Sequence, residues 1–489
     1  MQYSKTKNMK CLLGKYENNI NLIKEHFDKR EDLIIREIKS GNYNFAIVYL
    51  IGLTDTENIG RLVISPILQY KDFTSNKILK TLKESVLAFS EIDEESDFDN
   101  ICKEILSGKA IVIAHNCKSA LILQADKHKE RAIAEPPTNA VIKGPRNGFV
   151  ENLKTNLTSI KNILRTKDLK TINLTVGKYT QTSIAILYIK GIAEQKIVKE
   201  IKKRIEAIDI DGVIDSFYIS QFLENYKYSI FKQVGSSEKP DIVCAKMLEG
   251  RVAIVIDGSP IVLTLPFILL EDLQSSNDYY NDRTNVSFVR ILRLISLLIT
   301  ILLPGMYIAI ELHHYKTIPL KYLITIINTT QGLPLTPFLE MVFVLILFEI
   351  LYEASLRMPR YLGQAMSIVG ALILGDTAVK AGIVSPPSVM IVALSSITIY
   401  VIPDQAPQFS ITRILFLLAG AMQGFYGIIL GFLFLIIYFN DFDSYGAPYL
   451  APLTPYIKND MKDFLFKSNL TSMKTRPMSF KNKNRIRQR

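Results

Sequence analysis

Long apolar runs in the C-terminal part of the chain constrain its fold more than any other feature. Residues 294–312 form a nineteen-residue run whose one charge, Glu311, stands near its end. At 1.5 Å rise per residue, a helix of this length reaches across the roughly 30 Å apolar core of a bilayer. Comparable runs follow at 338–356, 361–384, 386–402 and 411–439. Five such runs predict an α-helical polytopic membrane domain over residues 291–440.

The positive charge of the chain is concentrated behind the last apolar run. The net charge of +11 divides into +4 for residues 1–290, −1 for 291–457 and +8 for 458–489. Positive residues mark the cytoplasmic side of a membrane, and each one near the surface attracts anionic lipid by about 1 kcal/mol. The tail therefore indicates a lipid membrane as partner and a cytoplasmic C-terminus, and no nucleic-acid partner is expected.

The number of membrane crossings stays open. Arg283, Arg290 and Arg293 precede the first run, so the N-terminal half is also expected to be cytoplasmic. Two cytoplasmic ends require an even number of crossings, whereas five single crossings would give an odd number. We expect four to six spans. Three segments offer the missing parity: an interfacial helix at 321–331, a glycine-broken hairpin at 411–439, or a re-entrant segment within 361–402.

The N-terminal half contains an internal repeat. FAIVYLIGL at 45–53 resembles IAILYIKGI at 184–192, and SGKAIVIA at 107–114 resembles EGRVAIVI at 249–256. The two offsets, 139 and 142 residues, nearly agree, which indicates tandem modules. Apolar runs typical of strands alternate with amphipathic helical patterns in each module. We therefore predict a duplicated cytoplasmic α/β domain.

These patterns divide the chain into six parts. They are an N-terminal helical segment at 1–40, a first α/β module at 41–130, a connector with EPP and GPR motifs at 131–170, a second α/β module at 171–290, the transmembrane domain at 291–440 and a basic cytoplasmic tail at 441–489. Residues 1–40 are polar and charged, so no N-terminal signal peptide is expected. The acidic segment 91–100 is expected to be a loop.

Common catalytic and metal-binding motifs are missing from the sequence. There is no GxxxxGK[ST], GxGxxG, HExxH or GxSxG pattern, and the four cysteines lack CxxC spacing. The residues 143–146 favour a turn over a phosphate loop, because Pro145 removes a backbone donor. The adjacent His313 and His314 favour an interfacial loop over a metal site. We expect neither an enzyme nor a cofactor or metal.

Charged residues inside the apolar runs are more informative. Exposing such a side chain to lipid costs about 2.5–3.5 kcal/mol or more, so it faces a bundle interior, a partner or water. Glu349 and Glu353 share a helix face, and Asp376 and Lys380 have the spacing of an ion pair. Internal pairing and an ion pathway both stay open, as do close packing and pore lining for the small residues of 363–382. The pore or gating candidates are Glu349, Glu353, Gly370, Leu372, Ile373, Gly375, Asp376 and Lys380.

Seven short motifs occur in a fixed order along the chain. They are Glu135-Pro136-Pro137, Gly144-Pro145-Arg146, Leu248-Glu249-Gly250-Arg251, Asp257-Gly258-Ser259-Pro260, Asp278-Tyr279-Tyr280, Gly382 to Pro386, and Gly446-Ala447-Pro448-Tyr449. Together they resemble the A subunit of GerA-type bacterial spore germination receptors, from about residue 130 to 457. The resemblance implies structural roles for Pro136, Gly144, Pro145, Arg146, Gly250, Arg251, Asp257, Gly258, Pro386 and Pro448.

The resemblance also implies a function. Such subunits lie in the inner spore membrane with a transporter-like B subunit and a lipoprotein C subunit, and they are thought to oligomerise into a nutrient-gated cation channel. It carries over no catalytic residues. Two alternatives stay open: the A-subunit-like protein associated with the dipicolinic-acid channel, which has the same architecture, and a membrane-anchored scaffold or signalling subunit with no pore of its own.

Overall fold

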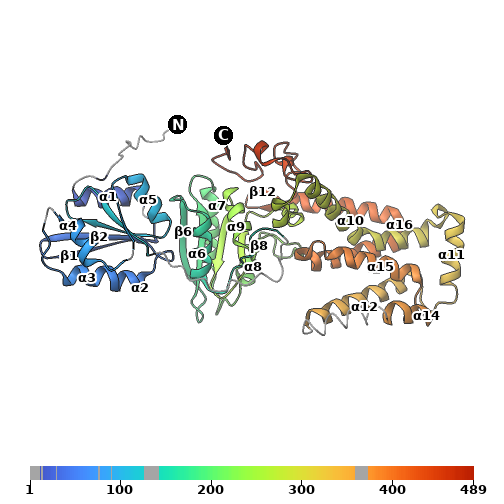
Figure 1. Cartoon of the computed structure of the whole chain (residues 1–489). Helices are drawn as coiled ribbons and strands as arrows, with labels where there is room; N and C mark the ends of the chain where they lie inside the picture. Colours follow the sequence, from blue (N-terminus) through green and yellow to red (C-terminus); the bar gives the residue numbers. More distant parts are fainter. Residues whose placement is uncertain are drawn as a thin grey trace. The chain divides into compact units, whose positions relative to one another are not determined.

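The computed structural model describes residues 12, 15–28, 30–74, 77–89, 91–125, 143–357 and 373–488. The chain forms two compact units, whose elements are labelled in Figure 1. The α/β unit contains Met1–Asn225, Val234–Pro266 and Lys474–Arg489. The helical unit contains Tyr226–Gln233 and Phe267–Met473.

The first module of the α/β unit is a five-stranded antiparallel sheet with helices on both faces (Figure 1). Its strands lie in the order β1, β2, β4, β5, β3 and span Leu33–Ser40, Tyr43–Leu50, Ala110–Ala114, Ala120–Leu123 and Ile92–Glu95. Ala46 and Val48 pack against α1 (Tyr16–His26) and α5 (Phe98–Leu106). Phe45 and Ile47 face the opposite layer, because side chains alternate along a strand. That layer comprises Thr56–Ile59 (α2), Gly60–Ile64 (η1), Ser65–Gln69 (α3), Ile78–Thr81 (α4) and Leu82–Val86 (η3).

The second module repeats this arrangement. Its strands lie in the order β6, β7, β9, β10, β8 and span Leu169–Val176, Thr182–Ile189, Val252–Ile256, Val262–Leu265 and Gly235–Ser237. Its helices are α6 (Leu153–Ile163), α7 (Gln195–Glu206), α8 (Ser216–Leu223) and α9 (Pro240–Leu248). The strands in corresponding places, β2 with β7 and β4 with β9, are those whose sequences repeat. The predicted duplication of an α/β module is therefore confirmed.

The interpretation of the acidic segment 91–100 as a loop is wrong. Ile92–Glu95 forms the edge strand β3, and the Asp97 side chain caps α5 by accepting from two backbone N–H groups. An edge strand tolerates charged side chains, because part of it faces water. The first sheet also begins at Leu33, ahead of the expected module boundary at residue 41.

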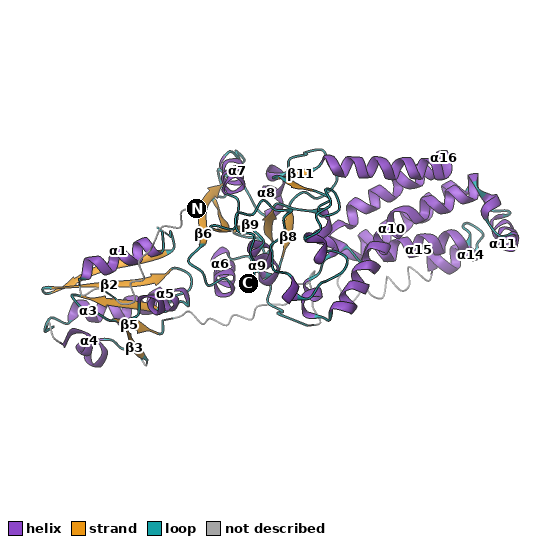
Figure 2. Ribbon diagram, turned by 90° about the horizontal axis from the view of Figure 1, so that it is seen from above, coloured by secondary structure: helices purple, strands orange, loops and turns teal. Residues whose placement is uncertain are grey.

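The helical unit consists of helices that pack lengthwise (Figure 2). They span Arg283–His313 (α10), Leu320–Thr330 (α11), Pro337–Arg357 (α12), Ala378–Lys380 (α14), Pro386–Ile399 (α15) and Ala406–Asp441 (α16). Among the described residues, two helical segments are long and apolar enough to cross a membrane, Arg283–His313 and Pro403–Asp441. The expected four to six spans are therefore supported only in part, since α12 carries four charged residues and α15 has 14 residues.

Helix α16 folds back on itself at Gly424. This residue has φ of 60° and ψ of −142°, far from helical values. A Cβ added at Gly431 would lie 3.3 Å from the ring of Phe416, although a straight helix would separate these residues by about 22 Å. The segments 406–423 and 425–441 therefore lie side by side. Of the segments that the parity argument left open, 411–439 is a glycine-broken hairpin, and its length alone does not make it one crossing.

Both ends of this hairpin lie at the same end of the helical unit. The Gln405 amide donates to Asp272 at 2.8 Å, and the Tyr449 N–H donates to the Phe442 carbonyl at 3.1 Å. The Leu269 N–H in turn donates to the Tyr449 carbonyl at 2.9 Å, and Leu269 and Asp272 share one short 3₁₀ helix, η4 (Leu269–Leu273). We call this end the base, and the end where the hairpin turns the tip.

The basic tail divides between the two units. Its first part begins with a small β-hairpin in the helical unit, formed by Asp443–Ser444 (β11) and Ala447–Pro448 (β12). Residues 474–488 belong to the α/β unit, where Arg476 Nε donates to the Leu248 carbonyl at 2.7 Å. The segment expected as one tail at 441–489 is therefore a folded part of both units.

Candidate functional site

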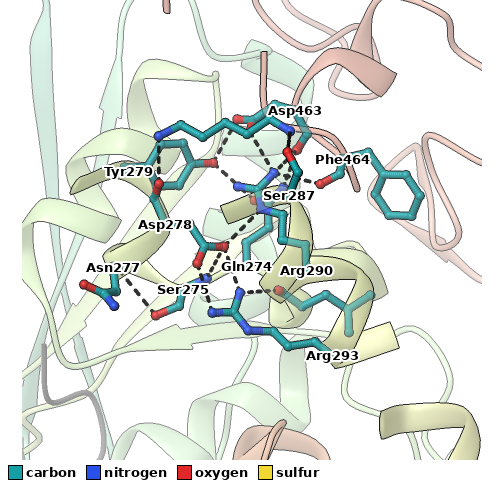
Figure 3. Close-up of polar contacts among 12 residues, drawn as sticks. Gln274, Ser275, Asn277, Asp278, Tyr279, Ser287, Arg290, Arg293, Asp463 and Phe464 are labelled. Carbon is teal, nitrogen blue, oxygen red and sulfur yellow. Dashed lines mark hydrogen bonds and ion pairs between the residues drawn. The ribbon is translucent and has the colours of Figure 1, made fainter. Parts of the chain in front are cut away.

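A buried network of charged side chains holds three segments together at the base of the helical unit (Figure 3). Asp278 lies at its centre and is 3% exposed. Arg293 donates to both carboxylate oxygens of Asp278 at 2.8 and 2.9 Å, and Arg290 Nε donates to one of them at 3.0 Å. We call these three residues, with Asp463 and Lys467, the Asp278 network.

Two local patterns in the sequence place the centre of this network. Ser275 and Asp278 form a reciprocal capping box at the start of the 3₁₀ helix η5 (Ser276–Tyr280), which fixes the Asp278 carboxylate. Arg290 and Arg293 are three residues apart in α10, so they project from the same face of the helix. Both arginines therefore reach the same carboxylate.

The tail completes the network. Arg290 Nη1 donates to Asp463 Oδ1 at 2.9 Å and to the carbonyls of Asp463 and Phe464 at 3.0 and 2.7 Å. Lys467 Nζ donates to the Asp278 carbonyl at 2.7 Å. Removing one partner from a buried pair of this kind costs about 3–5 kcal/mol, because the other charge stays buried. The network thus fixes α10, η5 and the tail to one another.

Sequence reasoning did not identify this network. Arg290 and Arg293 entered only as markers of membrane topology, and Asp278 only as part of a motif. Asp463 lies far along the chain, and no local pattern links it to the others. The one usable signal is a pair of arginines three residues apart, shortly after the Asp278-Tyr279-Tyr280 motif.

The predicted membrane charge Glu349 has a buried partner. Its Oε1 accepts from Arg413 Nη2 at 2.5 Å and from the Ser410 hydroxyl at 2.7 Å. Arg413 is 2% exposed, and its Nη1 also donates to the hydroxyls of Ser395 and Ser396 at 3.1 and 3.2 Å. This pair joins α12, α15 and α16. Arg413 was not predicted as a site residue, because it stands in a different apolar run from Glu349.

The other predicted charges form exposed pairs. Glu353 pairs with Arg357, and Asp376 pairs with Lys380, each at 2.6 Å between residues four apart in the sequence. The structure thus brings Asp376 and Lys380 together as their spacing indicates. Exposed pairs of this kind contribute at most about 1 kcal/mol. Glu349 and Glu353, one helical turn apart, have different partners.

The small-residue face proposed to line a pore lies mostly outside the described residues. Gly370 and Leu372 belong to that part of the chain, and the side chain of Ile373 is also outside the description. Gly375 lies in the π-helical turn η7 (Ile373–Thr377), where an added Cβ would meet no atom within 4 Å. The role of this face in a pore stays a prediction.

A further buried carboxylate, Glu340, joins α12 to the start of α15. Its Oε1 accepts from the N–H and the hydroxyl of Ser385 at 2.6 and 2.7 Å. Ser385 is the N-cap of α15, and Pro386 follows at the first helical position, where no N–H is needed. A negative charge is favourable at a helix N-terminus. Pro386 therefore has a structural position between two helices.

A second acidic group lies at the base. Burial raises the pKa of Asp272, whose side chain is 8% exposed, although Lys232 at 3.4 Å opposes the shift. Burial alone would lower the pKa of Lys232, but Asp272, Asp404 and Glu271 raise it. One lysine thus compensates several carboxylates at the end of the unit where the hairpin begins.

Charged pairs also connect the two modules of the α/β unit. Asp32 accepts from Arg30 at 2.5 and 3.0 Å and pairs with Lys161 of the second module at 2.7 Å. Asp28 pairs with Lys170 of the second module at 3.6 Å. Burial raises the pKa of Asp32, but the hydrogen bonds and charges of Arg30 and Lys161 outweigh it, so the pKa lies below its usual value. These pairs hold the modules against each other.

Two motif residues of the second module receive the C-terminal segment. Gly250 has φ of 102°, and a Cβ there would overlap the Asn482 side chain. The guanidinium of Arg251 lies 4.2 Å from the centre of the Phe480 ring, within cation–π range. The Gly250-Arg251 motif therefore serves to dock residues 474–488.

The remaining motif residues have structural positions or lie outside the description. Gly144 and Gly258 have φ of 108° and 87°, values that glycine adopts most easily. The Asp257 carboxylate accepts from the Leu153 N–H at 2.9 Å, which fixes the start of α6. Pro145 and Arg146 follow the turn at Gly144, Pro448 lies in β12, and Pro136 is outside the described residues.

The described residues offer charge pairs and packing contacts rather than a reactive centre. Within those residues, no group of three or more His, Cys, Asp or Glu side chains is placed to hold a metal ion. Burial raises the pKa of both Cys102 and Cys244 to about 12, so these thiols stay protonated. What the helical unit can do is keep or release a particular packing of its helices.

Known proteins resemble this chain over nearly its whole length. Spore germination protein KA of Bacillus subtilis (strain 168) is 36% identical over 475 residues, covering 96% of this chain and 87% of that protein. Spore germination protein GerLA of Bacillus cereus is 32% identical over 460 residues, covering 93% of each. The uncharacterized membrane protein YfkQ of Bacillus subtilis (strain 168) is 33% identical over 452 residues, covering 92% of this chain and 88% of that protein.

One solved structure and one family complete the comparison. The crystal structure of the N-terminal domain of the A subunit of the Bacillus megaterium spore germinant receptor GerK3 is 28% identical and covers 53% of this chain and 97% of that chain, with a TM-score of 0.41. The family described as Bacillus/Clostridium GerA spore germination protein matches residues 21–479. The chain therefore belongs to the GerA spore germination protein family, as its motifs suggest.

Proposed function

We propose that this chain is the membrane subunit of a nutrient germinant receptor that triggers spore germination. In this proposal it assembles with copies of itself, with a transporter-like B subunit and with a lipoprotein C subunit into a nutrient-gated cation channel. Membership of the GerA family supports the germination role. The channel and the assembly go further, and the geometry of the helical unit favours them.

The observation that carries the proposal is a set of charges left uncovered on apolar helices. The side chains of Glu353, Asp376 and Lys380 are 57%, 57% and 73% exposed in the single chain. Lipid contact would cost each about 2.5–3.5 kcal/mol or more. Ile346 and Ile350 on α12 are exposed as well. A ring of copies that surrounds a water-filled path would cover the apolar side chains and hydrate the charged ones.

The fold-back of α16 supports the proposed topology. A single crossing would place its two ends on opposite sides of the membrane, whereas both ends lie at the base. Two short crossings of 18 and 17 residues fit the lower limit of a membrane span. This favours an even number of crossings, with the N-terminal domain and the tail both cytoplasmic.

The proposed mechanism has three steps. A partner binds the nutrient, the helical unit shifts between two packings, and a path near 363–384, with Asp376 or Glu349 close by, admits cations. The Asp278 network lies where the linker after β10 enters α10. A movement of the α/β unit would therefore reach the first membrane helix through a rigid joint.

Purified receptor in lipid vesicles would test the proposal. We expect nutrient-dependent potassium flux, and we expect Glu349→Gln and Asp376→Asn to change it about fivefold, as a barrier change of about 1 kcal/mol does. Leu372→Ala would extend the test to the small-residue face. Glu84→Gln is the matched control, because Glu84 forms an exposed pair with Lys80 in the α/β unit. Complexes that pass no ions, with variants that germinate normally, would favour a scaffold without a pore.

A further inference from the structure

The tip of the α16 hairpin separates two backbone groups that an unbroken helix would join. In a continuous helix the Phe425 N–H would donate to the Ala421 carbonyl, four residues earlier. The break at Gly424 parts them, and two histidines from the end of α10 take their places. His313 Nε2 lies 2.8 Å from the Ala421 oxygen, and the Phe425 N–H donates to His314 Nε2 at 3.3 Å.

These two bonds define how each imidazole is protonated. A carbonyl oxygen only accepts, so His313 Nε2 carries a hydrogen and donates it to Ala421. A backbone N–H only donates, so His314 Nε2 is bare, and the ring is neutral with its hydrogen on Nδ1. Protonation leaves the bond of His313 intact but removes the acceptor of His314. The two neighbouring histidines therefore respond to acid in opposite ways.

We propose that the tip is a proton-binding site, at which proton uptake by His314 releases the Phe425 N–H and loosens the turn of the α16 hairpin. Histidine is the side chain that ordinarily changes its charge between pH 5 and 8. The ligand is therefore the proton itself, and the structural response is the loss of one of the two bonds that replace the helical pair.

The surroundings of the tip allow this exchange. His313 is exposed, and His314 is half-buried with its ring stacked on Phe425 at 4.8 Å between ring centres and 22° between ring planes. Within the described residues, neither histidine forms an ion pair. The charged groups on the neighbouring elements are Glu311 on α10, Lys316 on η6 (Tyr315–Thr317) and Glu340 on α12, while α15 carries none and α16 none between Arg413 and Asp441.

Glycine at position 424 is part of this site. Its φ of 60° is left-handed, and a Cβ there would lie 2.8 Å from His314 Nε2 and 3.0 Å from His313 Cβ. A side chain would therefore push both rings away from the backbone groups that they bind. The close approach of the histidines and the helix break thus depend on the same residue.

The first experiment reads the protonation states directly. The full chain, labelled with ¹⁵N-histidine, is placed in lipid bilayers and studied by solid-state NMR; its five histidines are assigned with His313→Gln and His314→Gln. At pH 8 we expect the hydrogen of His314 on Nδ1 and that of His313 on Nε2, and at pH 5 a doubly protonated His314. A hydrogen on Nε2 of His314 at pH 8 would overturn the proposal.

The second experiment follows the Phe425 amide. We expect its hydrogen-exchange protection factor to fall about fivefold to tenfold between pH 8 and pH 5, the loss of one ordinary hydrogen bond. His314→Gln should abolish this step, because its amide oxygen accepts the same N–H at every pH. His313→Gln is the matched control and should keep the step, since its amide NH₂ still donates to Ala421. A step that persists in His314→Gln would contradict the assignment.

The link to germination rests on the proposed function and is tested separately. Spores carrying the wild-type chain should change their nutrient response between pH 8 and pH 5, and His314→Gln spores should lose that dependence. A pH step in the Phe425 amide without any effect on germination would leave the proton site in place and refute its role in gating. Absence of both effects would refute the site itself.

Discussion

The base and the tip of the helical unit are held by different kinds of contact. At the base, Arg290 and Arg293 meet the carboxylates of Asp278 and Asp463, and all these groups bear full charges. At the tip, two neutral rings bind a carbonyl and an N–H of the broken α16 helix. Arginine keeps its charge at any pH that a protein survives, whereas histidine does not.

This difference indicates how the two ends can behave. Breaking a buried, multiply bonded charge pair is expensive, so the base should act as a fixed joint between α10, η5 and the tail. Losing one bond from a backbone group to a half-exposed ring is far cheaper. The helical unit is therefore expected to move at its tip and to stay fixed at its base, and four variants test this contrast.

Asp278→Asn should have the largest effect. It leaves Arg290 and Arg293 buried beside an uncharged amide, and we expect a loss of about 3–5 kcal/mol in stability. The measurement is the free energy of unfolding of the full chain in detergent. Glu353→Gln, which removes one partner of an exposed pair, is the control and should cost at most about 1 kcal/mol. Equal losses for the two variants would show that the base is not a fixed joint.

Gly424→Ala should have the next largest effect. Alanine at a left-handed φ, with its Cβ against both histidine rings, is expected to cost about 2–3 kcal/mol. Gly375→Ala is the matched control, because a Cβ there meets no atom within 4 Å. Thermal unfolding of both variants in detergent would compare them. If Gly424→Ala is as stable as the wild type, α16 does not turn at this residue in the way described.

Glu349→Gln should have a smaller effect than Asp278→Asn. Arg413 loses its charged partner but keeps the hydroxyls of Ser395 and Ser396, and the Glu349 side chain is 35% exposed. We expect a loss of about 1–2 kcal/mol, measured in the same unfolding assay. A loss as large as that of Asp278→Asn would mean that the centre of the helical unit is as tightly fixed as its base.

Asp32 sharpens the comparison from outside the helical unit. Its pKa is lowered in the folded chain by Arg30 and Lys161, so its stabilisation is present above the usual pKa of an aspartate, about 3.9, and is lost as the pH falls below it. We expect Asp32→Asn to reduce the stability of the α/β unit at pH 7 and to flatten its decline in acid. Since the tip responds between pH 5 and 8, the two transitions should not overlap. A change in the pH 5–8 range in Asp32→Asn would contradict this assignment.

The sequence was informative where its patterns are local. The repeat at offsets of 139 and 142 residues predicted two modules with matching strands, and the expected strand at 110–114 is β4. Strand β3 was missed because its residues Asp93 to Glu95 are acidic, as an edge strand permits. The glycine-broken hairpin was one of three open alternatives, since hydrophobicity alone does not distinguish one long helix from two that fold back.

The contacts that hold the helical unit together could not be predicted in this way. Arg290 meets Asp463, and Glu349 meets Arg413, across long separations in sequence and between different helices. A buried arginine in an apolar run shows that a partner exists but does not say which residue it is. The roles of His313 and His314 depend on the φ of Gly424, which the sequence does not specify.

The fold-back of α16 across the membrane is the central claim, and cysteine accessibility tests it most directly. Met422 lies at the tip and Asn440 at the base, and both are exposed. In protoplasts that express the chain, a membrane-impermeant maleimide should label Met422→Cys from outside, and it should label Asn440→Cys only after the membrane is made permeable. If Asn440→Cys is labelled from outside while Met422→Cys is protected, α16 crosses once and the proposed topology is wrong.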